Sequence, residues 1–144
     1  MERPDNLRIA EQAFAEIAAR FPHLHMVRDE EAEVELMIRL PVQPGLRQQV
    51  GLYLANNDEL NMVVGHFWLE WFPCTNPTKV EAYIEAVSGY LSGRYRILEH
   101  YRGKKCVKAE LQAPSATGWE TISISSSIRL PIPWKKTFKE VRNV

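Results

Sequence analysis

The chain has 144 residues, of which 25% are charged and 45% are hydrophobic. This balance is typical of one ordinary globular domain and excludes a disordered or collagen-like chain. Basic and acidic residues number 18 each, so the net charge is zero, which argues against nucleic-acid binding through bulk charge.

The charge is nevertheless distributed unevenly along the chain. Residues 1–72 carry 12 acidic and 6 basic side chains, whereas residues 73–144 carry 6 acidic and 12 basic ones. Two interpretations follow. Either the two halves face each other within one domain, or the opposite charges meet between chains or with an anionic partner.

The first predicted element is an amphipathic helix over residues 5–21. Asp5 is a suitable N-cap, and apolar side chains then recur every three or four positions, as one helix face requires. Pro22 ends this helix because its ring cannot continue the backbone hydrogen bonds. Residues 23–31 have no hydrophobic period and are expected to form an exposed connector.

Three strands are predicted next, over residues 33–40, 50–54 and 60–72, because their apolar positions follow a period of two. The third of them carries apolar side chains on both of its faces. A strand with one solvated face would instead alternate with polar residues. We therefore expect residues 60–72 to leave apolar area that a single layer of helices cannot cover.

The second half begins with a predicted helix that Asn76 caps, with Pro77 as its first residue and Gly93 as its left-handed C-terminal residue. Three alternating segments follow, and Gly103 lies in a hairpin turn between the first two of them. These segments cover residues 94–101, 105–112 and 119–127. Further apolar positions predict a short amphipathic C-terminal helix built on Trp134, Phe138 and Val141.

The expected fold is therefore a single α+β domain over residues 1–144. It has a largely antiparallel sheet of about six strands in the order α-βββ-α-βββ, with the helices on one face. In element order alone the chain resembles the small α+β fold of bacterial secretion chaperones, which bind extended segments of client proteins and usually dimerise. The zero net charge and the basic second half depart from those chaperones, which tend to be acidic. No run of 18 apolar residues and no secretory signal is present, so a cytoplasmic location is expected, with no membrane contact.

One group of candidate residues would line a pocket between the sheet and the helices. His66, Trp68 and Glu70 share one side of the predicted third strand, and Tyr83 lies on the second helix. Such a pocket would bind a small ligand or support modest acid-base catalysis. A thiol and an imidazole meeting across the hairpin, Cys106 and His100, would be the minimum for an activated nucleophile, although an inert buried cysteine is commoner.

Two further groups concern surfaces. The residues expected in a buried interface, where aromatic and methionine side chains dominate, are Met62, Trp68, Trp71, Phe72 and Trp119. A shallow basic and hydroxyl-rich surface for a small anionic ligand would use Arg94, Arg96 and Lys108, together with Thr121, Ser123, Ser125 and Ser127. No zinc, phosphate-loop, nucleophile-elbow or calcium motif occurs, so no cofactor, no metal and no reaction class is predicted.

Two hypotheses result. The leading one is a cytoplasmic, non-catalytic protein-interaction module and homodimer, either a chaperone of a client protein or an immunity protein that neutralises a toxin. The alternative is a small-ligand-binding protein or modest enzyme with its pocket around His66, Trp68 and Glu70. Nucleic acid is not an expected partner.

Overall fold

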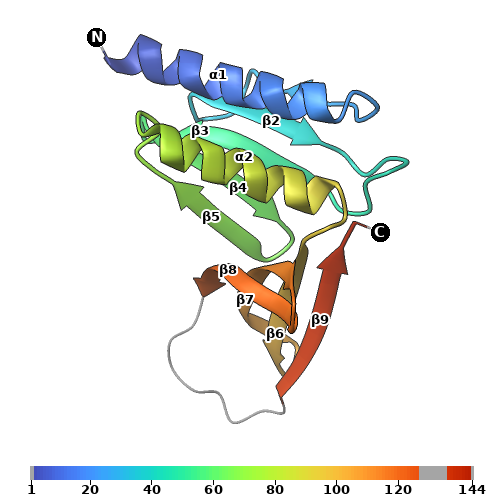
Figure 1. Ribbon diagram of the computed structural model, residues 1–144. Helices are drawn as coiled ribbons and strands as arrows, with labels where there is room; N and C mark the ends of the chain where they lie inside the picture. The colour runs from blue at the N-terminus through green and yellow to red at the C-terminus, as the bar shows by residue number, and fades with distance from the viewer. Residues whose placement is uncertain (1, 127–135, 144) are drawn as a thin grey trace.

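The structure, a computed structural model, describes residues 2–126 and 136–143. It confirms the α+β class, with two helices and two antiparallel sheets in the described part of the chain (Figure 1). The elements in chain order are α1 (Glu2–Arg20), β1 (Val27–Arg28), β2 (Leu36–Leu40), β3 (Val50–Ala55), β4 (Glu59–Val64), β5 (Phe67–Trp71), α2 (Pro77–Leu91), β6 (Arg96–Arg102), β7 (Lys105–Ser115), β8 (Gly118–Ser126) and β9 (Lys136–Arg142).

The first lobe, residues 2–93, is a five-stranded sheet in the order β1-β2-β3-β4-β5 with α1 and α2 across one face (Figure 1). Alternate strand residues point toward the helices and form most of the apolar core. Tyr83 of α2 is fully buried there, with its ring 5.4 Å from that of Trp71 and 6.2 Å from that of Phe14. Its hydroxyl donates to the Asn61 carbonyl at 2.8 Å, so the one polar atom of this buried ring has a partner.

The second lobe, residues 94–143, is a four-stranded antiparallel sheet in the order β8-β7-β6-β9. Its β7 and β8 pack beside β5, the edge strand of the first sheet, and the Trp68 N–H donates to Ser125 Oγ at 3.4 Å. At the end of β9, Asn143 Nδ2 donates to the carbonyls of Gly45 and Leu91, both at 2.7 Å. The second lobe therefore covers an edge that would otherwise expose unpaired backbone groups.

Several local predictions are confirmed. α2 begins at Pro77, and the Asn76 side chain accepts a hydrogen bond from the Thr78 N–H at 3.0 Å. Gly93 follows the end of α2 with a φ of +80°. The hairpin turn between β6 and β7 lies at Gly103, as the alternation on either side of it indicated.

The long third strand is the main correction. Residues 60–72 form the hairpin of β4 and β5, because Gly65 adopts a φ of +57° and the chain reverses at Gly65 and His66. The reversal brings Phe67 opposite Val64, which places the alternate residues of both strands on the helix-covered face. Most of the apolar surplus of this segment is therefore ordinary core.

Three other predictions also require correction. The sequence suggested one sheet of about six strands, whereas the described residues form sheets of five and four strands. The short β1 lies inside the predicted connector. Residues 136–142, expected in a C-terminal helix, form β9, because pairing with β6 along all seven residues outweighs their helical spacing. Trp134 lies outside the described residues.

Candidate functional site: the open sheet face and the junction pocket

The face of the five-stranded sheet that points away from the helices carries a row of residues across four strands. Arg39, Gly51, Val63 and Trp68 are register partners from β2 to β5. The neighbouring row consists of Met37, Tyr53, Asn61 and Glu70. Neither described helix lies on this open face, and the Trp68 side chain is 48% exposed there.

A hollow lies beside Gly51 on the open face. Met37 takes up the space directly above Gly51, because a Cβ atom at this position would lie 3.1 Å from Met37 Cε and 3.9 Å from Val63 Cβ. The hollow has a volume of about 360 Å³, and Gln48, Gln49 and Gly65 complete its border. It is a shallow apolar depression with polar side chains at one end.

A second hollow, the junction pocket, lies where the two sheets meet. Its volume is about 230 Å³, and its lining includes His66, Trp68, Cys106, Lys108 and Ser125. Gly65 borders both hollows. We call the two together the open-face groove; it runs from Met37 and Arg39, past Trp68, to Ser125 on the second sheet.

A buried carboxylate lies beside the junction pocket. Glu99 is 2% exposed; its Oε1 accepts from the Tyr101 hydroxyl at 2.8 Å and its Oε2 accepts from the His66 N–H at 3.2 Å. Burial, the hydrogen bond to Glu99 and the charge of Glu99 raise the pKa of Tyr101 to about 12. The carboxylate thus holds the β4–β5 turn against the second sheet.

The structure does not support the predicted cysteine nucleophile. Burial, followed by the negative charge of Glu99, raises the pKa of the Cys106 thiol. The thiol donates to the Lys108 carbonyl at 3.5 Å, and the His100 imidazole is engaged with Glu110 instead. A neutral thiol is a poor nucleophile, so the junction pocket lacks an activated group of this kind.

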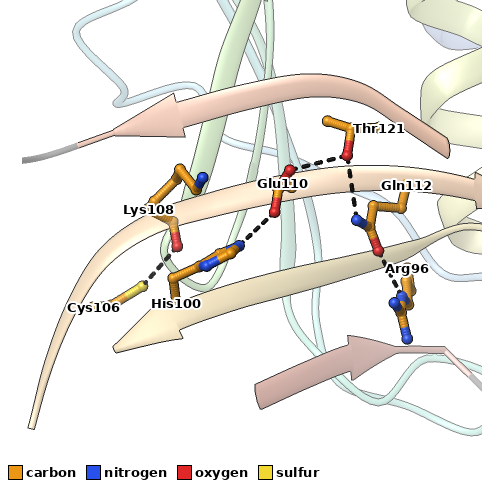
Figure 2. A network of polar contacts seen from close by, with 7 residues as sticks. All are labelled: Arg96, His100, Cys106, Lys108, Glu110, Gln112 and Thr121. Carbon is orange, nitrogen blue, oxygen red and sulfur yellow. Dashed lines mark hydrogen bonds and ion pairs between the residues drawn. The ribbon is translucent and has the colours of Figure 1, made fainter. Parts of the chain in front are cut away.

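A network of polar side chains crosses the outer face of the second sheet (Figure 2). His100 Nε2 contacts Glu110 Oε2, and the Thr121 hydroxyl donates to Glu110 Oε1 at 2.9 Å. Gln112 Nε2 donates to Thr121 Oγ1 at 3.2 Å, and Arg96 Nε donates to Gln112 Oε1 at 2.8 Å. Strands β6, β7 and β8 each supply part of this network.

Most polar atoms of the network pair with one another, although His100 Nδ1 is buried without a hydrogen-bond partner in the described part of the chain. Burial by itself would raise the pKa of Glu110, but the hydrogen bonds from His100 and Thr121, with the nearby charge of Lys108, outweigh it and lower the pKa. Arg96 also forms an ion pair of 2.9 Å with Glu140 and lies 4.3 Å from the Trp119 ring. We therefore interpret this face as a structural network.

The predicted anion surface is accordingly not assembled. Arg96 is committed to the network, Lys108 contributes to the junction pocket, and Arg94 stacks on the Tyr95 ring at 5.1 Å. The pairing of β7 with β8 is irregular between Leu111 and Gln112. Ser123 and Ser125 therefore lie on the opposite face of β8 from Thr121. Ser127 lies outside the described residues.

The pocket candidates are separated in the same way. His66 and Trp68 both line the junction pocket, and Glu70 lies on the open face in the row next to Trp68. Tyr83 is in the core on the opposite side of the sheet, so the four side chains do not line one pocket.

Of the interface candidates, Trp68 and Phe72 are about half exposed, at 48% and 50%. Met62 and Trp71 are buried beneath the helices, and Trp119 is half-buried between Arg96 and Arg142. The residues that the sequence did not single out are the glycines: Gly51 lies within the apolar strand β3 and Gly65 in the turn after β4, and glycines among apolar residues are the signal that could have identified the hollow.

A third hollow lies between the helices, with a volume of about 470 Å³. Ile9, Val80 and Ile84 contribute apolar lining. Arg20 crosses between the helices, because it contacts Glu16 of α1 at 2.8 Å and Glu85 of α2 at 3.2 Å. These ion pairs neutralise two carboxylates of the hollow, those of Glu16 and Glu85, and hold the two helices together. We therefore assign them a structural role.

Within residues 2–126 and 136–143, no three His, Cys, Asp or Glu side chains are grouped so that they could hold a metal ion, and no helix is long and apolar enough to cross a membrane. The chain matches no protein-family model, no curated protein and no solved structure.

Proposed function

We propose that the chain is a non-catalytic protein-interaction module that binds its partner through the open-face groove. The observation that carries this proposal is the position of Trp68, 48% exposed beside the Gly51 hollow on a sheet face that neither described helix covers (Figure 1). Tryptophan next to an apolar depression is the residue type most enriched where protein interfaces bind most strongly.

The chemistry of the groove favours binding over catalysis. Both oxygens of Glu99 already accept hydrogen bonds, and the pKa of the Cys106 thiol is raised. The junction pocket, about 230 Å³, is smaller than the roughly 300–1,000 Å³ of typical small-molecule sites. A shallow groove with an exposed indole fits a protein surface better than an enclosed ligand.

Chaperoning a client and neutralising a toxin are two forms of this proposal, and the identity of the partner separates them. A reducing, cytoplasmic location belongs to the same proposal. Cys74 and Cys106 do not form a disulfide with each other, which is consistent with it.

The test is site-specific photo-crosslinking in living cells of the source organism. A photoreactive phenylalanine analogue replaces Trp68, and in a matched control it replaces Val42, which is 64% exposed between β2 and β3 and lines neither hollow of the groove. We expect a defined adduct from position 68 that is absent from position 42. Equal adducts from both positions, or none from position 68, would contradict the proposal.

A further inference from the structure

The two lobes carry opposite charges. Residues 1–93 hold 14 acidic and 7 basic side chains, a balance of −7, whereas residues 94–144 hold 4 acidic and 11 basic ones, a balance of +7. The boundary between lobes therefore divides the charge more sharply than the midpoint of the sequence does.

These charges do not neutralise each other inside the molecule. Every ion pair among the described residues joins two partners of the same lobe. The contacts between lobes instead join side chains to backbone groups: Ser125 accepts from the Trp68 N–H, Asn143 donates to the Gly45 carbonyl, and Glu99 accepts from the His66 N–H. Arg142 also donates to a carbonyl, that of Gly93, at 2.8 Å. Pairs within each lobe, such as Asp29 with Arg39 and Glu30 with Arg28, leave the net charge of that lobe unchanged, so each lobe can attract the opposite charge of another molecule.

Each lobe has one cluster of its predominant charge, and the two clusters lie at opposite ends of the molecule. The acidic pole, residues 29–35, joins β1 to β2 at the sheet edge remote from β5 and the second lobe; Glu31 and Glu33 are exposed there. The basic pole is the β6–β7 turn, with Lys104 and Lys105 exposed.

The basic pole lies at the far end of the second sheet. Arg102 pairs with Lys105 on one side and with Lys136 at the start of β9 on the other, which places these side chains close together. The other ends of β6 and β9 are the ones that join the first lobe, near Gly93 (Figure 1). The open-face groove therefore lies between an acidic pole and a basic pole.

We infer that the occupant of the open-face groove is a second copy of this chain, arranged antiparallel, so that the acidic pole of each copy meets the basic pole of the other. This inference rests on the proposed function. Charge complementarity selects the partner, because the same molecule supplies both signs in equal number. An antiparallel pair has two-fold symmetry and forms both polar contacts at once, whereas a head-to-tail pair forms only one.

The test is sedimentation velocity on the full chain and two charge-reversal variants at micromolar concentration. The basic pole is reversed by Lys104→Glu with Lys105→Glu, and the acidic pole by Glu31→Lys with Glu33→Lys. We expect the wild type to sediment at twice the chain mass of 16.6 kDa at low salt. Roughly 500 mM NaCl should weaken the dimer, because it shortens the screening length to well below 10 Å.

Each reversal alone should weaken self-association at least about tenfold, since like charges then face each other at both contacts. Mixing the two variants should restore a dimer, and so should all four substitutions in one chain. Glu81→Lys, an exposed change on α2 away from both poles, is the matched control and should sediment as the wild type does.

A wild type that is monomeric at low salt would overturn the inference. So would reversal variants that dimerise normally, or a mixture that stays monomeric. If the chain is monomeric but position 68 still crosslinks to a different protein, only this inference fails and the proposed function stands. If the chain is monomeric and position 68 also gives no adduct, both this inference and the proposed function are contradicted.

Discussion

The two lobes bury different kinds of side chain. In the first lobe, the helices and one sheet face bury an apolar core that includes Leu52, Met62 and Tyr83 with almost no exposure. In the second lobe, the fully buried apolar side chains are few, and Glu99 and His100 are buried among them. The first lobe depends on apolar burial, and the second on satisfied polar contacts.

This difference shows which kind of residue change each lobe tolerates. An apolar core loses stability roughly in proportion to the volume removed. A buried polar network loses it when one member is left without a partner, because desolvation is then no longer offset. The predictions below separate these two mechanisms.

The largest effect is expected in the first lobe. Leu52, fully buried in β3, should lose about 2–5 kcal/mol of unfolding free energy on substitution by alanine. Val42→Ala, at a 64% exposed position, should stay within about 0.5 kcal/mol of wild type. Urea unfolding measures both. Similar values for the two variants would contradict the described core.

A smaller effect is expected in the second lobe. Glu110→Gln should cost about 1–3 kcal/mol, because the amide cannot replace the carboxylate toward both His100 and Thr121. Glu120→Gln, an exposed change on the neighbouring strand β8, is the matched control. Hydrogen exchange should show the loss in β6 and β7 first. Unchanged exchange there would mean that the network contributes little.

Acid should weaken the same network. The pKa of Glu110 is lowered in the folded chain, so its contribution is fully present above the unfolded value of about 4.5 and is lost as the pH falls through the folded value. The difference in unfolding free energy between wild type and Glu110→Gln should therefore be constant near neutral pH and shrink in acid. A difference that grows in acid would contradict a lowered pKa of Glu110 in the folded chain.

The smallest expected effect is spectroscopic. The pKa of Tyr101 is raised to about 12, mainly by burial and then by Glu99, so its stabilising contribution is present below pH 10 and is lost as the pH rises toward 12. Alkaline titration by ultraviolet absorbance should show late ionisation of several tyrosines, because burial also raises the pKa of Tyr90 to about 12 and that of Tyr83 well above its usual value. Tyr101→Phe should lower the amplitude of this late phase by one tyrosine. An ordinary tyrosine titration at position 101 would contradict the contact with Glu99.

Local sequence signals predicted the elements that depend on neighbouring residues. The cap at Asn76, the start at Pro77 and the turn at Gly103 each follow from the conformation of a few adjacent residues. The α+β class and the placement of the helices on one face followed from these elements.

The signals failed where distant pairing decides the structure. Residues 60–72 have continuous apolar character, and only the left-handed backbone of Gly65 divides them into two strands. Residues 136–142 have helical spacing but pair with β6, which is far from them in sequence. For the same reason the sequence placed Trp68 and Tyr83 in one pocket, although they lie on opposite faces of the sheet.

The central claim is that the open face, rather than exposed apolar area in general, mediates association. Sedimentation of Trp68→Glu and Ile122→Glu tests it, since the two side chains are 48% and 44% exposed and lie on different sheets. With circular dichroism confirming that both variants fold, we expect Trp68→Glu to be monomeric at concentrations where wild type and Ile122→Glu are dimeric. If Trp68→Glu dimerises as wild type does, or if both variants lose the dimer equally, the claim is contradicted.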